Sequence, residues 1–130
     1  MPQQRSSTVR LRTSLYEEAV AIVAEEYERE LALDDIARRV ASSRRQLQRA
    51  YAEIGNTTFR SHLTAVRMDA AAELLGGGPL TVREVAQRVG YRQPAQFAKA
   101  FRRHHGLSPS SYRARRRLAV HPRPPIRAAA

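Results

Sequence analysis

The sequence of 130 residues contains no cysteine and no tryptophan. The lack of cysteine excludes a disulfide-stabilised secreted scaffold, a cysteine-ligated zinc or iron–sulfur site and a cysteine nucleophile. No apolar run approaches the roughly 20 residues of a membrane-spanning helix, and residues 1–13 lack the apolar core of a signal peptide. We therefore expect a cytoplasmic protein with one compact domain or two small lobes.

Negative charge is also scarce, because 12 acidic residues face 23 basic ones and the formal net charge is +11. Residues 1–35 carry four arginines against eight acids, a net −4, and the remainder carries +15. Lys99 is the only lysine, and arginine has a planar fork of donors that suits phosphate and guanine. A biased genome composition is an alternative explanation for the excess of arginine over lysine. The net charge nevertheless favours an anionic partner, with nucleic acid before acidic lipid.

Apolar residues recur at helical spacing, and no stretch alternates convincingly as a strand. Two pairs, Ser43 with Gln46 and Thr81 with Glu84, have the pattern of a capping box at a helix start. The sequence predicts an all-α fold of about seven helices, with two subdomains joined by a long linker helix. The expected divisions are a flexible tail (1–13), a first subdomain (14–56), a linker helix with a glycine-rich loop (57–78), a second subdomain (79–119) and a disordered Pro/Arg-rich tail (120–130).

The two subdomains are copies of one motif. A shift of 49 residues, and of 50 after a one-residue insertion, aligns their apolar positions: Ile36, Ala37, Val40, Leu47, Ala50 and Tyr51 with Val85, Ala86, Val89, Phe97, Ala100 and Phe101. Each copy has a short helix, a tight turn and a second helix with a basic outer face, which is a helix-turn-helix. One such match is weak evidence, but two matched copies in a strongly basic chain are much stronger.

The predicted length of the linker helix is comparable to the distance between successive major grooves of DNA. It is predicted to span about 27 Å at ~1.5 Å per residue, and successive major grooves lie ~34 Å apart along one face of a duplex. The sequence therefore predicts that one chain places both second helices in adjacent major grooves. A palindromic dimer is not required, so we expect a monomer on DNA.

The second copy resembles the signature of the AraC/XylS family of bacterial transcription regulators. The resemblance covers roughly residues 16–117, and its most specific residues are Val89, Gly90, Tyr91, Pro94, Phe97, Phe101 and the run Gly106-Leu107-Ser108-Pro109-Ser110-Ser111-Tyr112-Arg113. It implies a DNA-binding domain alone, similar to the stand-alone MarA, SoxS and Rob-type activators that bind asymmetric sites as monomers. It also implies contact with RNA polymerase. We expect no effector-binding domain in a chain this short.

The first copy departs from the second at three positions. Ala32 stands where Thr81 caps a helix, Ala41 replaces Gly90, and Asn56 replaces Gly106. Loss of a side-chain cap costs about 1 kcal/mol. We therefore expect the first copy to be the less stable one.

Candidate DNA contacts lie on the outer face of the second helix of each copy. They are Arg44, Arg45, Gln48 and Arg49 in the first copy, and Gln93, Gln96, Lys99 and Arg103 in the second. The family resemblance places Arg45, Gln48 and Arg49 at base-contacting positions, where Arg suits guanine and Gln suits adenine. In the second copy Pro94 and Ala95 replace longer polar side chains, so less base contact is expected there.

Three further residues are candidate phosphate contacts: Ser43, Arg67 and Thr81. Helix capping explains Ser43 and Thr81 without DNA, and a structural ion pair explains Arg67 equally well. His104 and His105 are adjacent on a predicted helix, where neighbouring side chains point in different directions. We expect them to interact with the helix C-terminus, and we predict no metal site and no cofactor.

The leading hypothesis is a sequence-specific, nucleoid-associated transcription regulator of the activator type that binds double-stranded DNA. The alternative is a nonspecific or architectural nucleic-acid-binding protein. No nucleophile–base pair or phosphate-binding loop is present, so the sequence does not predict an enzyme. RNA is disfavoured because helices do not fit its narrow major groove, and the tail lacks the apolar face of a membrane-surface helix.

Overall fold

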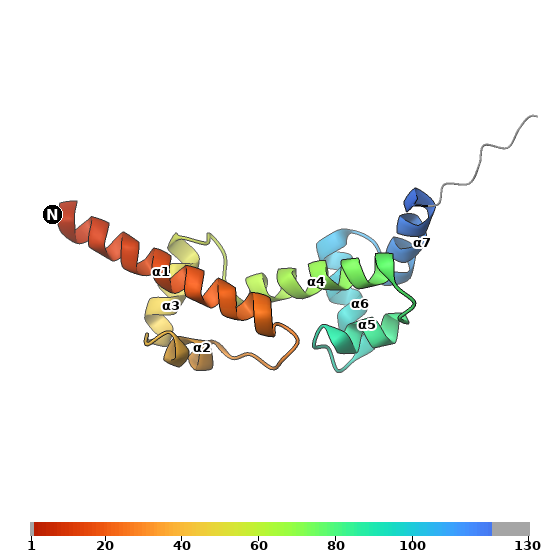
Figure 1. Ribbon diagram of the computed structural model, residues 1–130, viewed down its shortest axis with the longest axis horizontal. Helices are drawn as coiled ribbons and strands as arrows, with labels where there is room; N and C mark the ends of the chain where they lie inside the picture. Colours follow the sequence, from red (N-terminus) through yellow and green to blue (C-terminus); the bar gives the residue numbers. More distant parts are fainter. Residues whose placement is uncertain (1, 121–130) are drawn as a thin grey trace, which may run out of the picture. The chain divides into compact units, whose positions relative to one another are not determined.

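The computed structural model describes residues 2–120, with the side chains of residues 7–119 (Figure 1). This part of the chain forms seven α-helices and no strand: α1 (Pro2–Glu26), α2 (Leu33–Arg39), α3 (Arg44–Glu53), α4 (Phe59–Gly77), α5 (Val82–Arg88), α6 (Pro94–His105) and α7 (Pro109–Val120). The predicted all-α class is confirmed. The chain forms two compact units, Met1–Arg67 and Met68–Ala130, and α4 contributes residues to both.

Unit 1 is built around apolar side chains that recur every three or four residues on α1. Leu15, Ala19 and Val23 are buried and pack with the inner faces of α2, α3 and the start of α4. The helix-turn-helix formed by α2 and α3 supplies the rest of the core, namely Ile36, Ala37, Leu47, Ala50 and Tyr51. The α1 helix therefore holds the motif from behind and leaves the outer face of α3 exposed.

The flexible tail predicted over residues 1–13 is not found, because α1 is helical from Pro2 onward. This segment has no apolar stripe, which is why the sequence pattern places the helix start near Ser14. No glycine or proline interrupts residues 3–26, and the Thr13 hydroxyl donates to the Val9 carbonyl 2.8 Å away. An ion pair between Arg12 and Glu53 also ties this part of α1 to the end of α3.

Unit 2 repeats this arrangement with the second part of α4 behind the motif. Met68, Ala71 and Leu75 of α4 are fully buried, as are Val85 and Val89 at α5 and Phe97 and Phe101 on α6. The α7 helix closes the core through Tyr112, whose ring meets Phe101 edge-on at a centroid distance of 5.3 Å. The α5–α6 pair is thus supported on both sides, by α4 and by α7.

The sequence repeat is also a repeat of backbone conformation. Ala41 and Gly90 occupy the same place in the two turns and have φ angles of 54° and 100°, and Asn56 and Gly106 have φ angles of 51° and 81°. Glycine adopts this left-handed region at little cost, whereas alanine does not. The expected absence of a side-chain cap at Ala32 is confirmed, and the capping boxes at Ser43 and Thr81 both form.

The C-terminal part of the chain agrees only partly with the sequence prediction. The Pro/Arg-rich tail was predicted over residues 120–130, but Val120 is the last residue of α7, and residues 121–130 lie outside the described range. None of the described helices is both long and apolar enough to cross a membrane.

Candidate nucleic-acid interface

The orientation of α3 follows from its cap and from its buried face. Ser43 Oγ accepts a hydrogen bond from the Gln46 N–H at 3.1 Å, and Gln46 Oε1 accepts one from the Ser43 N–H at 3.4 Å. Leu47, Ala50 and Tyr51 are buried one turn apart on the opposite side of the helix. The cap and the buried face together turn the remaining side chains of α3 toward solvent.

Four of these outward side chains are the residues that the sequence predicted: Arg44, Arg45, Gln48 and Arg49. All four are exposed. The Arg44 guanidinium lies 3.5 Å from Asp34 Oδ2, which is at the limit of a hydrogen bond. Within the described residues Arg45, Gln48 and Arg49 make no hydrogen bond or ion pair. The N–H groups of these three side chains are therefore available to hydrogen-bond acceptors of another molecule.

In unit 2, a buried face orients α6 as it does α3, but α6 begins with a proline and has no side-chain cap. Pro94 occupies the first turn, where its missing N–H costs no helix hydrogen bond, and Gly106 ends the helix at φ 81°. Phe97 and Phe101 are fully buried. The exposed face carries the predicted set of Gln93, Gln96, Lys99 and Arg103, none of which bonds to another described side chain.

The three candidate phosphate contacts all have structural roles. Thr81 Oγ1 accepts from the Glu84 N–H at 3.1 Å, and the Glu84 carboxylate accepts from the Thr81 N–H at 3.0 Å. The bond from the Thr81 N–H to the carboxylate lowers the pKa of Glu84, and the Thr81 side chain adds to this effect. Arg67 donates from Nε and from a terminal nitrogen to the carbonyls of Tyr27 and Arg29, each at 2.8 Å. A phosphate contact by Ser43, Arg67 or Thr81 stays a prediction.

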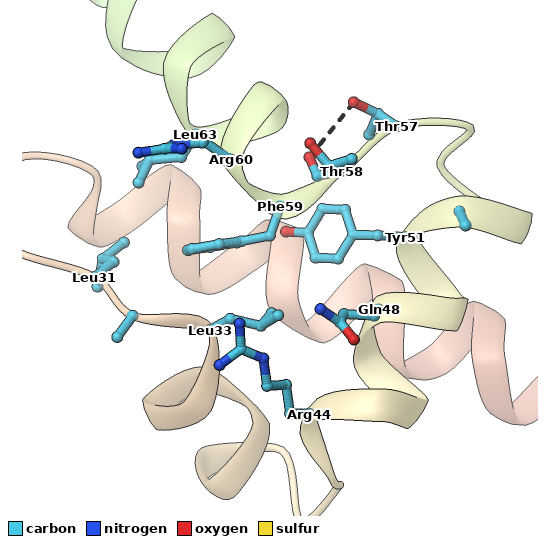
Figure 2. A pocket seen from close by; sticks show the side chains of 12 residues that line it. Leu31, Leu33, Arg44, Gln48, Tyr51, Thr57, Thr58, Phe59, Arg60 and Leu63 are labelled. Carbon is cyan, nitrogen blue, oxygen red and sulfur yellow. Dashed lines mark hydrogen bonds between the residues drawn. The ribbon is translucent and has the colours of Figure 1, made fainter.

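A pocket of about 550 Å³ lies beside α3 in unit 1. Its wall is largely apolar, with Leu31, Leu33 and Phe59, and Figure 2 shows Arg44, Gln48 and Arg60 around it. Arg60 is exposed and has no partner among the described residues, yet sequence reasoning did not single it out. The available signal was its place in the first turn of α4, directly after the Asn56 turn. It adds positive charge next to the predicted contact face.

A partly buried polar contact holds α3 against α4. The Tyr51 hydroxyl lies 2.9 Å from His62 Nδ1, and the Tyr51 ring meets Tyr16 edge-on at 5.2 Å. Burial raises the pKa of Tyr51 and lowers the pKa of His62, because each charged form loses water. Both groups are therefore held in their neutral forms, which suits a structural role.

Known proteins that resemble this chain contain a helix-turn-helix domain or are transcription regulators. A family model described as a helix-turn-helix domain matches residues 36–115. The lactose operon transcription activator of Staphylococcus xylosus is 28% identical over 95 residues, which are 73% of this chain and 34% of that protein. The chain spans 22 to 34% of the length of the first curated relatives it matches, so it corresponds to one part of them.

Two solved structures share the fold. A transcriptional regulator from Chromobacterium violaceum, described as an AraC-type DNA-binding domain-containing protein, has a TM-score of 0.76 and 28% identity, over 79% of this chain and 92% of that one. The DNA-binding domain of the global transcriptional factor AdpA, solved in complex with a target DNA, also has a TM-score of 0.76. It is 31% identical and aligns over 84% of this chain and 97% of that one.

Proposed function

Because the chain belongs to the AraC family of transcription regulators and carries its DNA-binding domain, we propose that it binds one asymmetric duplex site sequence-specifically. The observation that carries this proposal is the matched pair of exposed faces on α3 and α6. Each face belongs to a helix that is buried on its other side. Among its exposed side chains, Arg45, Gln48 and Arg49 on α3, and Gln96 and Lys99 on α6, have no partner in the described part of the protein. AdpA, which has this fold, is seen bound to DNA.

We assign the roles of the side chains by their chemistry. Arg45 and Arg49 are suited to the O6 and N7 atoms of guanine, and Gln48 to the N6 and N7 atoms of adenine. Gln96 and Lys99 are the corresponding groups on α6, where Pro94 and Ala95 leave fewer polar atoms in the first turn. Arg44, Arg60, Gln93 and Arg103 then serve as phosphate or groove contacts, which position the protein without selecting a sequence.

The length of α4 supports a two-groove mode of binding by one chain. Its 19 residues correspond to about 28 Å of helix, close to the ~34 Å between successive major grooves. We propose that α3 and α6 enter adjacent major grooves and that a monomer occupies a site of about 20 bp, or two turns of duplex.

We propose that the protein activates transcription from its promoters. The support is the relative from Staphylococcus xylosus, whose name describes an operon activator. On this proposal the protein acts in the cytoplasm at the nucleoid and contacts RNA polymerase. The acidic outer face of α1, which carries Glu17, Glu18 and Glu25, is a surface free of the basic side chains proposed to hold DNA.

The experiment is selection of bound duplexes from a random pool, followed by footprinting and competition at ~0.15 M salt. We expect one conserved site of about two turns, with two protected segments on one face of the duplex. Specific binding exceeds nonspecific binding by at least ~10³ in such proteins. Equal affinity for every duplex would instead support the alternative, a nonspecific or architectural nucleic-acid-binding protein.

A further inference from the structure

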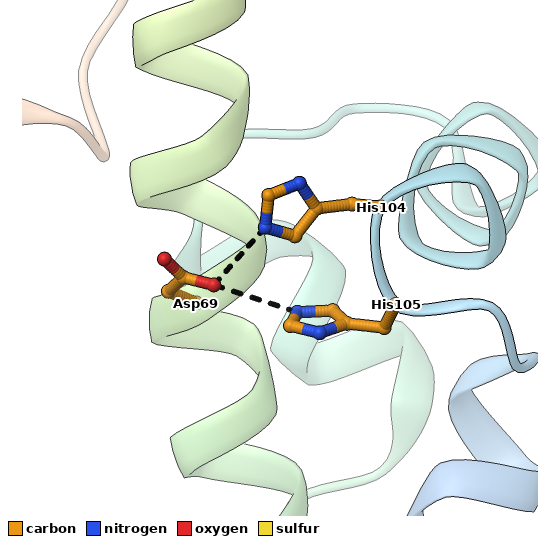
Figure 3. Close-up of side chains that lie close together, drawn as sticks. All are labelled: Asp69, His104 and His105. Atoms are coloured by element: carbon orange, nitrogen blue, oxygen red, sulfur yellow. Dashed lines mark hydrogen bonds and ion pairs between the residues drawn. The ribbon is translucent and has the colours of Figure 1, made fainter.

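Three side chains from two helices of unit 2 converge on one point at the protein surface (Figure 3). Asp69 comes from α4, and His104 and His105 are the last two residues of α6. One carboxylate oxygen of Asp69, Oδ1, lies 3.1 Å from His104 Nε2 and 3.7 Å from His105 Nε2. All three candidate ligand atoms lie within 4.8 Å of one another.

This arrangement corrects the expectation that the two adjacent histidines point in different directions. Their rings stand nearly perpendicular, at 89°, with centroids 4.6 Å apart, and both Nε2 atoms turn toward the same carboxylate. Neighbouring residues leave a helix about 100° apart, but the imidazole side chain is long enough to bend back toward a shared partner. Asp69 supplies that partner from a helix 35 residues away in sequence.

The spacing of the three atoms suits a metal ion. Zinc binds imidazole nitrogen at ~2.0–2.1 Å and carboxylate oxygen at ~2.0–2.2 Å, so tetrahedral ligand atoms lie roughly 3.4 Å apart. The observed distances of 3.1 and 3.7 Å fall on both sides of that value. Small rotations of these side chains are therefore sufficient to surround one ion, and the fourth position faces solvent.

The cluster is partly fixed and partly accessible. The His105 ring is held by Phe101 and Tyr112, at centroid distances of 4.5 and 5.5 Å, and its side chain is only 19% exposed. The side chains of His104 and Asp69 are 33% and 68% exposed, so an ion can reach them from solvent. His105 Nε2 also lies 3.0 Å from the Met68 carbonyl, and this hydrogen bond would be given up when Nε2 binds a metal.

We propose that Asp69, His104 and His105 form a binding site for a divalent transition-metal ion of the zinc class. Two imidazoles with one carboxylate favour Zn²⁺, Ni²⁺, Co²⁺ or Cu²⁺ over Mg²⁺ and Ca²⁺, which prefer sites made of oxygen alone. The bound ion links α4 to the C-terminal end of α6. Because α6 carries the proposed DNA contacts Gln96 and Lys99, the metal stabilises the unit that presents them. The proposed metal site shares no residue with the proposed DNA contacts, so each proposal can fail without the other.

The test uses the full chain without a histidine tag, freed of metal by a chelator. Calorimetric titration with ZnCl₂ is expected to show one ion per chain, and MgCl₂ is expected to give no binding. Asp69→Asn and His104→Gln should each weaken zinc binding by about tenfold or more, in line with the effect of disturbing a metal site. His62→Gln is the matched control, because His62 lies in unit 1 beside Tyr51, outside the cluster, and its replacement should leave zinc binding unchanged.

A second measurement avoids relying on His105 variants, since removing a stacked ring also disturbs the core. Nitrogen-15 NMR of the histidine side chains should show zinc-dependent shifts at Nε2 of both His104 and His105 in the unmodified protein. Zinc should also raise the melting temperature of the wild type but not of Asp69→Asn. The proposal is overturned by absent or non-saturable zinc binding, by wild-type affinity in Asp69→Asn and His104→Gln, or by loss of binding in His62→Gln.

Discussion

Arg67 and Arg113 make equivalent contacts in the two units. The Arg67 guanidinium donates to the carbonyls of Tyr27 and Arg29, just after α1 ends, and Arg113 donates to those of Leu75 and Leu80, at the end of α4 and in the loop beyond it. In each unit an arginine from a later helix thus holds the chain segment that leads into the helix-turn-helix. The two positions do not coincide under the sequence repeat, so the contact is repeated in space rather than in sequence.

Replacing either arginine should destabilise its unit. Hydrogen bonds to charged groups contribute roughly 1.5–3 kcal/mol, so we expect Arg67→Ala and Arg113→Ala each to lower the free energy of unfolding by about that amount. Urea denaturation followed by circular dichroism measures it. Arg83→Ala is the control, because Arg83 is exposed and has no partner in the described structure, and it should change stability by less than about 0.5 kcal/mol. Equal effects at all three positions would refute the assignment.

Ala41→Gly should stabilise the protein. Ala41 has a φ of 54°, a left-handed conformation that costs an alanine about 1–2 kcal/mol. Part of this gain is offset by the greater freedom of glycine in the unfolded chain, so we expect a net increase of about 0.5–1 kcal/mol. Thermal or urea unfolding measures the change. Ala21→Gly, at an exposed position in the interior of α1, should instead cost about 1 kcal/mol, and stabilisation by both substitutions would contradict the explanation.

Gly55→Ala should destabilise unit 1 for a different reason. A Cβ atom at Gly55 would lie 2.4 Å from Tyr16 Cε1 and 2.9 Å from the Tyr51 carbonyl oxygen. Overpacking of this kind costs about 1–3 kcal/mol. At Gly77 a Cβ would meet nothing within 4 Å, so Gly77→Ala should be neutral or slightly stabilising. Chemical denaturation of both variants tests the contrast, and a tolerated alanine at Gly55 would rule out the close approach.

His62 should make stability depend on pH below neutrality. Burial lowers its pKa below the ordinary value of 6.5, so the folded state binds this proton less readily than the unfolded state. Its contribution is fully present above about pH 6.5 and is lost as the pH falls through the folded-state pKa. His62→Gln retains an acceptor for the Tyr51 hydroxyl but does not titrate. Unfolding curves from pH 7.5 to 5 should therefore fall more steeply for the wild type, and parallel curves would contradict this role.

Arg49→Ala tests the assignment of base contacts on α3. We expect a loss of about 1–3 kcal/mol in binding to the selected site and a relaxed preference at one base pair. Arg60→Ala is the comparison, because a phosphate contact weakens binding to all sequences about equally. Competition binding with a set of single-base variants of the site distinguishes the two patterns. A uniform loss for Arg49→Ala would demote this residue to a phosphate contact.

Most of the secondary structure and the candidate contact face were predictable because they depend on local interactions. A capping box joins residues three positions apart, Pro94 suits the first turn of α6, and the left-handed residue at Gly106 ends it. The buried faces of α3 and α6 follow from apolar residues three and four positions apart. Since the remaining positions must face outward, Gln48, Arg49, Gln96 and Lys99 were identifiable before the fold was known.

The helical start of α1 was not predictable from this pattern, because the segment has no apolar stripe. Its Arg12 pairs with Glu53, which lies 41 residues further along the chain than Arg12.

Local chemistry thus established the seven helices of the described residues, the caps of α3, α5 and α6, the repeat and the side of α3 and α6 that faces solvent. Three features required the folded chain: the guanidinium contacts of Arg67 and Arg113, the placement of Arg60 and Gln48 around one pocket, and the convergence of Asp69 with His104 and His105. Each of these arrangements brings together residues from separate segments of the chain, at separations such as 35 or 38 residues that no periodicity encodes. Helix packing sets those distances, and it depends on the fit of whole buried faces rather than on any short segment.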